Sequence, residues 1–267
     1  MGSVPCAVRA HLVQLDSAWE DPATNFERVR RLMERARPDA GDLAVLPEMF
    51  DTGFSFNLEK TADADGRTLG FIRELAREMR VVLHGSRTVL GPDGRGRNRA
   101  TIAGSDGRVL AEYDKIHPFS FGRETERFSG GDAVVTYPWA TPAGETLTVC
   151  PAICYDLRFP ELFRRGMLAG AEVFALGANW PAPRKLHREV LSVARAIENQ
   201  AYMLSVNRAG RDPFLEYAGG SMAIDPQGNV LGRLGPEEGV LSVEIDPRAV
   251  RDWREKFPAI RDVRLAT

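Results

Sequence analysis

The chain has 267 residues, of which 43% are hydrophobic and 27% are charged, and its formal net charge is −2. This composition is typical of a soluble globular protein, and the length suffices for one large α/β domain with a substantial core. The near-neutral charge favours neither a nucleic-acid nor a membrane partner. We therefore expect residues 1–267 to form a single domain.

Localisation and metal content can be predicted from short patterns. No apolar run reaches roughly 18 residues, the length of a membrane span. Residues 1–9 lack the basic and then apolar pattern of a signal peptide. Three cysteines, at Cys6, Cys150 and Cys154, fit a reducing cytoplasm better than a disulfide framework. The four histidines are scattered without metal-ligand spacing, so we expect a cytoplasmic protein without a metal.

Strands and helices alternate in the first half of the chain. Asp21 and Pro22 predict a helix start, because a capping side chain precedes a proline in the first turn, and Pro38 ends this helix. Asp106 and Gly107 predict the turn of a hairpin. The other elements expected here are strands at 4–15, 43–46 and 81–85 and a helix at about 69–79.

The second half predicts helices at 160–169 and 186–200, strands at 173–176, 202–207 and 240–245, and a hairpin turn at 226–229. A charged tail at 247–267 carries the apolar residues Trp253, Phe257 and Ile260. Residues 91–96 are rich in glycine and arginine, but no helix follows them as a phosphate-binding loop requires, so we expect a hairpin tip. The pattern as a whole predicts a mixed sheet covered by helices.

A cysteine ends an apolar run at residues 149–153, and Pro160 suits the first turn of a new helix. Cys154 is therefore expected on a strand-to-helix turn, where a helix N-terminus favours negative charge. A thiol benefits from such a place because the thiolate is the nucleophile. The alternative is a cysteine that only fills a small apolar site in the core.

Polar residues follow three further strands. Glu48 comes just after the strand at 43–46, Lys115 directly follows a strand, and Asn179 and Trp180 follow the strand at 173–176. Open sheets bind ligands at the carboxyl ends of their strands. Taken singly, Glu48 is also consistent with a helix cap or surface acid, and Lys115 with a solvated loop charge.

The order Glu48, Lys115, Cys154 resembles the carbon–nitrogen hydrolase (nitrilase) superfamily over essentially the whole chain. Three motifs in succession are similar to its ω-amidase branch, which acts on the terminal amide of 2-oxo dicarboxylic acid monoamides: CYDLRFPE at 154–161, ANWPAPR at 178–184 and ARAIENQ at 194–200. The resemblance implies an α/β fold, a four-layer αββα sandwich, commonly dimerised through helices. We also expect the apolar residues of the tail at 247–267 to seek burial at a dimer interface.

The resemblance also implies a mechanism without a cofactor. Cys154 would attack an amide carbonyl and form a thioester with loss of ammonia, and water would then release the acid. Glu48 would transfer the protons. Lys115 would stabilise the oxyanion, with the Tyr155 backbone N–H as a second donor, and Glu124 matches the family's second glutamate, which supports the lysine.

Substrate binding is expected to involve Tyr155, Arg158, Asn179 and Trp180. Arg158 could grip a substrate carboxylate with two parallel hydrogen bonds, or it could pair with Glu198 and hold two helices together. The segment at 117–124 departs from many ω-amidases, which leaves the substrate open.

Other functions remain open at this point. Within the superfamily they are another aliphatic amidase or an N-carbamoyl amino acid hydrolase, whereas Tyr155-Asp156 after the cysteine disfavours a true nitrilase. Outside this chemistry, the chain could be a Cys–His hydrolase using His117 or His187, or an inactive binding protein on the same fold.

Overall fold

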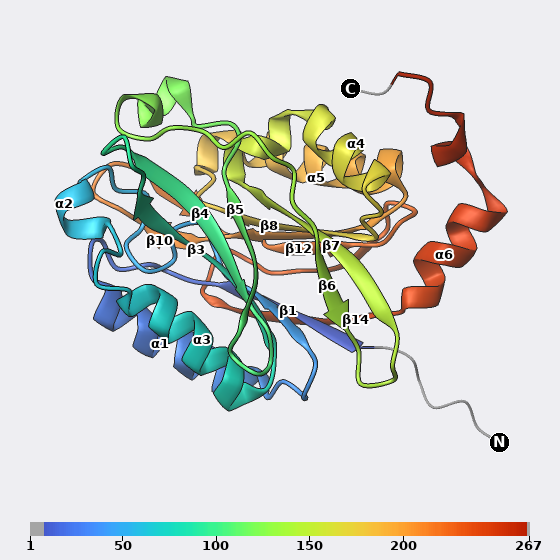
Figure 1. The fold of residues 1–267 in the computed structure, drawn as a ribbon, viewed down its shortest axis with the longest axis horizontal. Coiled ribbons are helices and arrows are strands. Elements are labelled where there is room, and N and C mark those ends of the chain that lie inside the picture. Colours follow the sequence, from blue (N-terminus) through green and yellow to red (C-terminus); the bar gives the residue numbers. More distant parts are fainter. Residues whose placement is uncertain (1–7, 266–267) are drawn as a thin grey trace.

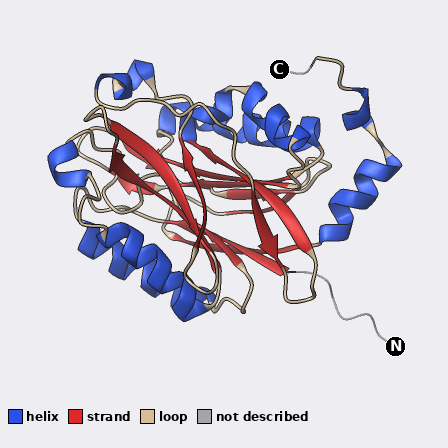
Figure 2. Ribbon diagram, in the orientation of Figure 1, coloured by secondary structure: helices blue, strands red, loops and turns tan. Residues whose placement is uncertain are grey.

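Two six-stranded sheets pack face to face, and helices cover their outer faces (Figure 1). The structure is a computed structural model that describes residues 8–265. Figure 2 shows strands gathered in the middle of the molecule with helices on both sides. This is the four-layer αββα arrangement that the sequence resemblance implies.

The first sheet has the order β14-β1-β2-β3-β4-β5, with β1, β2 and β3 parallel and the other neighbours antiparallel. Its outer face is covered by two amphipathic helices, and the Asp21 carboxylate caps the first of them by accepting from Thr24 N at 3.1 Å. The elements are β1 (Val8–Gln14), α1 (Pro22–Ala36), β2 (Leu43–Val45), α3 (Arg67–Met79), β3 (Val82–Leu90), β4 (Gly96–Ala103), β5 (Val109–Asp114) and β14 (Gly239–Ile245).

The second sheet has the order β13-β12-β9-β8-β7-β6, with β7, β8 and β9 parallel. Helices α4 and α5 contact each other, and α5 packs on β9 and β12. The elements are β6 (Tyr137–Ala140), β7 (Thr146–Ile153), α4 (Pro160–Leu168), β8 (Val173–Ala178), α5 (Lys185–Asn199), β9 (Tyr202–Asn207), β12 (Met222–Ile224) and β13 (Val230–Arg233).

The two sheets approach each other closely at Gly177 in β8. A Cβ atom built there would lie 2.6 Å from the Leu46 carbonyl oxygen and 3.2 Å from the Glu48 nitrogen. Only a glycine lets the end of β8 lie this near the chain that leaves β2. The ends of two central strands, one from each sheet, are thereby brought together.

Most predicted elements are confirmed, with small shifts at their ends. The strand predicted at 4–15 begins at Val8 within the described residues, and residues 4–7 lie outside them. The strand predicted at 81–85 continues to Leu90, and residues 91–95 form the tip of the β3–β4 hairpin as expected. The sequence analysis did not predict β6, nor three short elements: α2 (Leu58–Thr61), β10 (Ala209–Arg211) and β11 (Glu216–Ala218).

The charged tail after Ile245 begins with a helix that the sequence analysis did not predict, α6 (Pro247–Lys256), at one edge of the molecule (Figure 1). It is fixed on its own chain: Arg254 donates to the Gln200 carbonyl at 2.9 Å, and Gln200 Nε2 donates to the Phe257 carbonyl at 2.7 Å. Ile260 packs against the main core, while Phe257 stays exposed. Within residues 8–265 no helix combines the length and hydropathy that crossing a membrane requires.

Candidate active site

Four polar residues meet where strands of both sheets end. Glu48 follows β2 and Lys115 follows β5 in the first sheet, while Cys154 follows β7 and Asn179 follows β8 in the second. Cys154 and Asn179 meet because β7 and β8 are parallel neighbours whose carboxyl ends lie at the same edge of the second sheet. The structure thus brings together residues that are more than a hundred positions apart in the sequence.

Lys115 lies between two carboxylates. Its Nζ donates to Glu48 Oε1 and to Glu124 Oε2, each at 2.8 Å, and all three side chains are at most 1% exposed. Glu124 comes from a 3₁₀ turn, Glu124–Glu126, and also accepts the backbone N–H of Phe119. A buried ammonium needs such partners, and both carboxylates are held within reach of its protons.

The Glu48 carboxylate is held at both oxygens. Oε1 also accepts from Asn98 Nδ2 at 2.8 Å, and Oε2 accepts from the Asn179 backbone N–H at 3.0 Å. The turn after Glu48 is fixed because Met49, at φ 42°, donates its N–H to Ser86 Oγ at 2.7 Å. Glu48 therefore has little freedom to rotate away from the lysine and the cysteine.

Cys154 occupies a strained turn. Its φ of 45° lies in the left-handed region, which a residue with a side chain rarely adopts, and it begins the 3₁₀ turn Cys154–Arg158 between β7 and α4. The buried Asp156 carboxylate stabilises this turn by accepting the Ile153 N–H at 2.9 Å. The thiol is 9% exposed and faces the cavity.

The Glu48 carboxylate lies near the Cys154 thiol and favours its neutral form. Burial above all, and then the negative charge of Glu48, raise the pKa of Cys154 well above its ordinary value, although the Lys115 charge opposes them. A helix N-terminus after Cys154 therefore does not suffice to lower the pKa of this thiol. The thiol holds its proton and has a carboxylate beside it that can accept one.

Burial also acts on the pKa values of Lys115 and Glu124. Burial disfavours the Lys115 ammonium, but Glu124 and Glu48 outweigh it and raise the lysine pKa. Burial raises the pKa of Glu124, and the Lys115 charge only partly opposes it. The cationic lysine is thus stable in the site, where it can act as a hydrogen-bond donor but not as a base.

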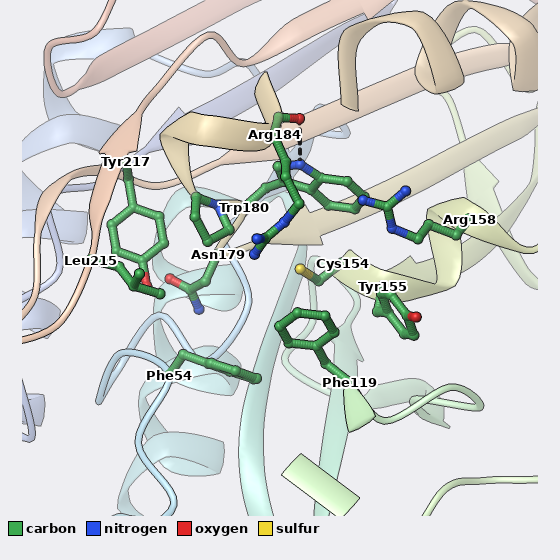
Figure 3. Close-up of a pocket in the computed structure, with 11 residues that line it drawn as sticks. Phe54, Phe119, Cys154, Tyr155, Arg158, Asn179, Trp180, Arg184, Leu215 and Tyr217 are labelled. Atoms are coloured by element: carbon green, nitrogen blue, oxygen red, sulfur yellow. Dashed lines mark hydrogen bonds between the residues drawn. The ribbon is translucent and has the colours of Figure 1, made fainter. Parts of the chain in front are cut away.

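A pocket opens above Cys154 (Figure 3). The space within it is about 400 Å³, including the part that opens to solvent, which is within the range of small-molecule sites. Aromatic side chains form a large part of the wall, and the ring centres of Phe119 and Tyr155 are 4.9 Å apart. The lining residues are Phe54, Phe119, Cys154, Tyr155, Arg158, Asn179, Trp180, Pro181, Arg184, Leu215 and Tyr217. Such a pocket suits a small molecule with an apolar middle.

Asn179 and Trp180 are both rigidly placed in this wall. Asn179 Nδ2 donates to the Glu48 carbonyl at 2.6 Å, while its buried Oδ1 has no hydrogen-bond partner within residues 8–265. The indole N–H of Trp180 donates to the Arg184 carbonyl at 2.8 Å. An unsatisfied buried acceptor on a residue that lines the pocket is suited to a ligand N–H.

Arg158 lies at the pocket and not in a helix–helix ion pair. Its guanidinium carbon is 4.9 Å from the centre of the Trp180 ring, and its Nη2 is 3.3 Å from His187 Nδ1. The alternative partner, Glu198, is bound by Arg195 Nη1 at 2.9 Å. Of the two alternatives for Arg158, the pairing with Glu198 is therefore wrong.

The two histidines of the Cys–His alternative have other partners. His117 Nδ1 lies 2.8 Å from Asp156 Oδ1, and His187 Nδ1 faces Arg158. The charged groups that act on the Cys154 thiol are Glu48 and Lys115. The thiol therefore lies near a carboxylate, whereas the two imidazoles contact other groups.

Sequence reasoning missed several residues that shape the site. Asn98 supports Glu48 from the middle of β4, where no local pattern marks it. Arg184 and Phe119 lay inside quoted segments but were not singled out, and Tyr217 comes from the unpredicted strand β11. Asp156 could have been found, because a buried acid two residues after a nucleophile commonly anchors a turn.

Comparison with known proteins agrees with this geometry. The family profile described as carbon-nitrogen hydrolase matches residues 9–255. A 2-oxoglutaramate amidase from Bacillus subtilis is 34% identical over 256 residues, covering 94% of this chain and 96% of its own. The omega-amidase YafV from Escherichia coli K12 is 34% identical over 253 residues, with 94% of each chain covered.

A solved structure shares the fold closely. XC1258 from Xanthomonas campestris, a CN-hydrolase superfamily protein with an arsenic adduct in its active site, superposes with a TM-score of 0.88 at 34% identity, covering 97% of this chain and 98% of its own. The profile match and these relatives extend over almost the whole chain, so they include the segments that carry Glu48, Lys115 and Cys154. The chain therefore belongs to the carbon–nitrogen hydrolase family of the nitrilase superfamily and is similar to its ω-amidase branch.

Proposed function

We propose that this hydrolase cleaves the terminal amide of a small acid, a 2-oxo dicarboxylic acid monoamide, through a thioester on Cys154. The observation that carries the proposal is the buried Glu48–Lys115 pair at 2.8 Å, with the Cys154 thiol near Glu48, at a pocket that is also lined by arginine. The names of the Bacillus and Escherichia relatives support the same substrate class.

Acylation begins with proton transfer from the Cys154 thiol to Glu48. The thiolate sulfur attacks the amide carbonyl carbon, and the carbonyl oxygen becomes an oxyanion that Lys115 Nζ and the Tyr155 backbone N–H stabilise. Glu48 then returns the proton to the amide nitrogen, the C–N bond breaks and ammonia leaves. Asn179 Oδ1, the buried acceptor, binds an N–H of the departing group.

Deacylation uses the same carboxylate. Glu48 takes a proton from water, the hydroxyl oxygen attacks the thioester carbonyl, and the C–S bond breaks as the sulfur recovers the proton. The acid leaves and the neutral thiol is restored. Glu124 acts through Lys115 by keeping the ammonium aimed at the carbonyl oxygen, and no cofactor takes part.

The experiment that tests this function is an ammonia-release screen. It compares glutamine, 2-oxoglutaramate, 2-oxosuccinamate, simple aliphatic amides, carbamoyl amino acids and nitriles on the purified protein. We expect the highest kcat/KM for the 2-oxo acid amides. A higher value for simple amides, for carbamoyl amino acids or for nitriles would replace the substrate class, and no ammonia from any of them would favour a binding protein.

We also propose a homodimer in the cytoplasm. Three large apolar side chains, Leu186, Val190 and Ile197, recur at helical spacing on α5 and are more than half exposed. A second copy of the chain is the occupant we assign to this stripe, because a self-complementary face buries the same residues twice. The tail at 247–267 contributes its exposed Phe257 as a second candidate contact.

A further inference from the structure

Two arginines lie at the pocket on either side of Cys154 in the view of Figure 3. Arg158 lies over Trp180, and the guanidinium carbon of Arg184 is 5.5 Å from the centre of the Phe119 ring. Both side chains are half-buried. In the described part of the chain, neither guanidinium forms an ion pair with a carboxylate.

The unpaired state of these arginines contrasts with the lysine deeper in the site. Lys115 is enclosed by two carboxylates, Glu48 and Glu124, so its positive charge is more than offset. Two unbalanced cations beside an apolar pocket repel each other and attract an anion, and low local polarity strengthens both effects. The charge at the pocket is therefore asymmetric: the lysine beside the thiol is offset by two carboxylates, whereas the arginines carry excess positive charge.

The position of Arg184 is fixed by its backbone. Its N–H donates to the Pro181 carbonyl at 3.1 Å, and its carbonyl accepts the Trp180 indole N–H at 2.8 Å. It ends the 3₁₀ turn Ala182–Arg184, from which helix α5 begins. Arg184 thus enters the pocket from the same segment as Asn179 and Trp180, whereas Arg158 ends the 3₁₀ turn that begins at Cys154.

We propose that Arg184 is a specificity-determining residue that, together with Arg158, holds the acid end of the substrate. The inference rests on the proposed function and adds a second cation to the single arginine expected from the sequence. A 2-oxo acid presents a carboxylate and an adjacent carbonyl oxygen in one plane, and two guanidinium groups can share these three acceptors. The amide end then points to Cys154.

The test measures KM and kcat for three amides of matched length: 2-oxoglutaramate, the monoamide of glutaric acid, and uncharged pentanamide. Arg184→Gln should raise KM about tenfold to a hundredfold for the two acids, the usual loss of a charge-assisted hydrogen bond, and leave pentanamide unchanged. Arg184→Lys should restore part of the loss. Lys185→Gln, which removes the adjacent exposed charge, is the matched control and should change none of the three.

A binding measurement separates this inference from the proposed function. Calorimetry with Cys154→Ser protein should detect 2-oxoglutarate, and adding Arg184→Gln should weaken that binding at least about tenfold. If the wild type hydrolyses none of the three amides, the proposed function fails, and the calorimetry still decides the role of Arg184. Equal losses on pentanamide and the acid amides, or unchanged binding of 2-oxoglutarate, would overturn the assignment of Arg184.

Discussion

Asp156 and His117 are joined twice: the carboxylate oxygen Oδ1 accepts the backbone N–H of His117 at 3.0 Å and lies 2.8 Å from its Nδ1. The other oxygen, Oδ2, binds the Ile153 N–H and the hydroxyl of Tyr113. One buried carboxylate therefore connects the loop just after Lys115 with the turn that carries Cys154. The distance between Lys115 and Cys154 therefore depends on the Asp156 carboxylate.

Asp156→Asn should lower kcat about a hundredfold, the cost of misplacing reacting groups by about an ångström. The amide supplies only one acceptor oxygen, so at least one of the four donors loses its partner. KM for acid-bearing amides should hardly change, because the arginines are untouched. Tyr113→Phe removes a single donor and should cost less than tenfold; a KM effect as large as the kcat effect would contradict a positioning role.

Cys154 and Cys150 should differ completely in reactivity. Burial raises the pKa of Cys150 to about 12, and its sulfur faces the core beside Gly166, away from the pocket. Cys154→Ser should abolish turnover, while Cys150→Ala should keep most of it. Mass spectrometry after brief exposure to substrate should locate an acyl adduct on Cys154. An adduct on Cys150 would sink the assignment.

Glu48→Gln and Lys115→Met should each slow acylation by at least about a hundredfold, the usual loss for a general base or an oxyanion donor. Single-turnover kinetics would measure this step directly. Circular dichroism should show both variants folded; because each leaves a buried partner without its opposite charge, a lower Tm is expected. A near-normal acylation rate in either variant would reject its role.

His84 should make the protein less stable in acid. Burial lowers its pKa from 6.5 to about 4, so between these values the unfolded chain binds a proton that the folded chain does not. The stability is complete above pH 6.5 and is lost as the pH falls toward 4, about 2 kcal/mol at pH 5. Urea unfolding of His84→Gln should show a smaller loss between pH 7.5 and 5 than the wild type, whereas exposed His187→Gln should match the wild type.

The apolar stripe on α5 predicts the oligomer. Light scattering at micromolar concentration should give twice the chain mass of 29.5 kDa or more. Val190→Asp places a charge in the middle of the stripe and should shift the protein to the monomer, because burying an unpaired charge is costly. Phe257→Asp tests the tail in the same way. A wild-type mass of 29.5 kDa would refute the dimer.

Local patterns predicted the elements well because β7, β8 and the helices have clear apolar periodicity. The approach of Glu48, Lys115 and Cys154 could be expected only from the resemblance to a known family, since it depends on how two sheets pack. Asn98 shows the limit: one amide in β4 becomes part of the site through its pairing with β3 and β5. Nothing in its neighbouring residues marks that position.

Arg158 shows a second limit of sequence reasoning. Its alternative pairing with Glu198 was plausible in sequence, but Arg195, three residues earlier on the same helix, binds that acid. Intrahelical pairs at this spacing form without any change in packing. The rotation of α5 about its own axis, relative to the turn Cys154–Arg158, decides which arginine lies at the pocket. That rotation is a property of the tertiary structure.

Because the site is divided between two sheets, activity requires that both parts of the chain are assembled. Glu48 and Lys115 precede the loop at 129–136, and Cys154 and Asn179 follow it. A protease cut in this loop would place Glu48 and Lys115 on one fragment and Cys154 and Asn179 on the other. Each fragment would lack half of the reacting groups. Neither fragment alone would release ammonia, so recovery of activity on mixing would measure the docking of one half onto the other.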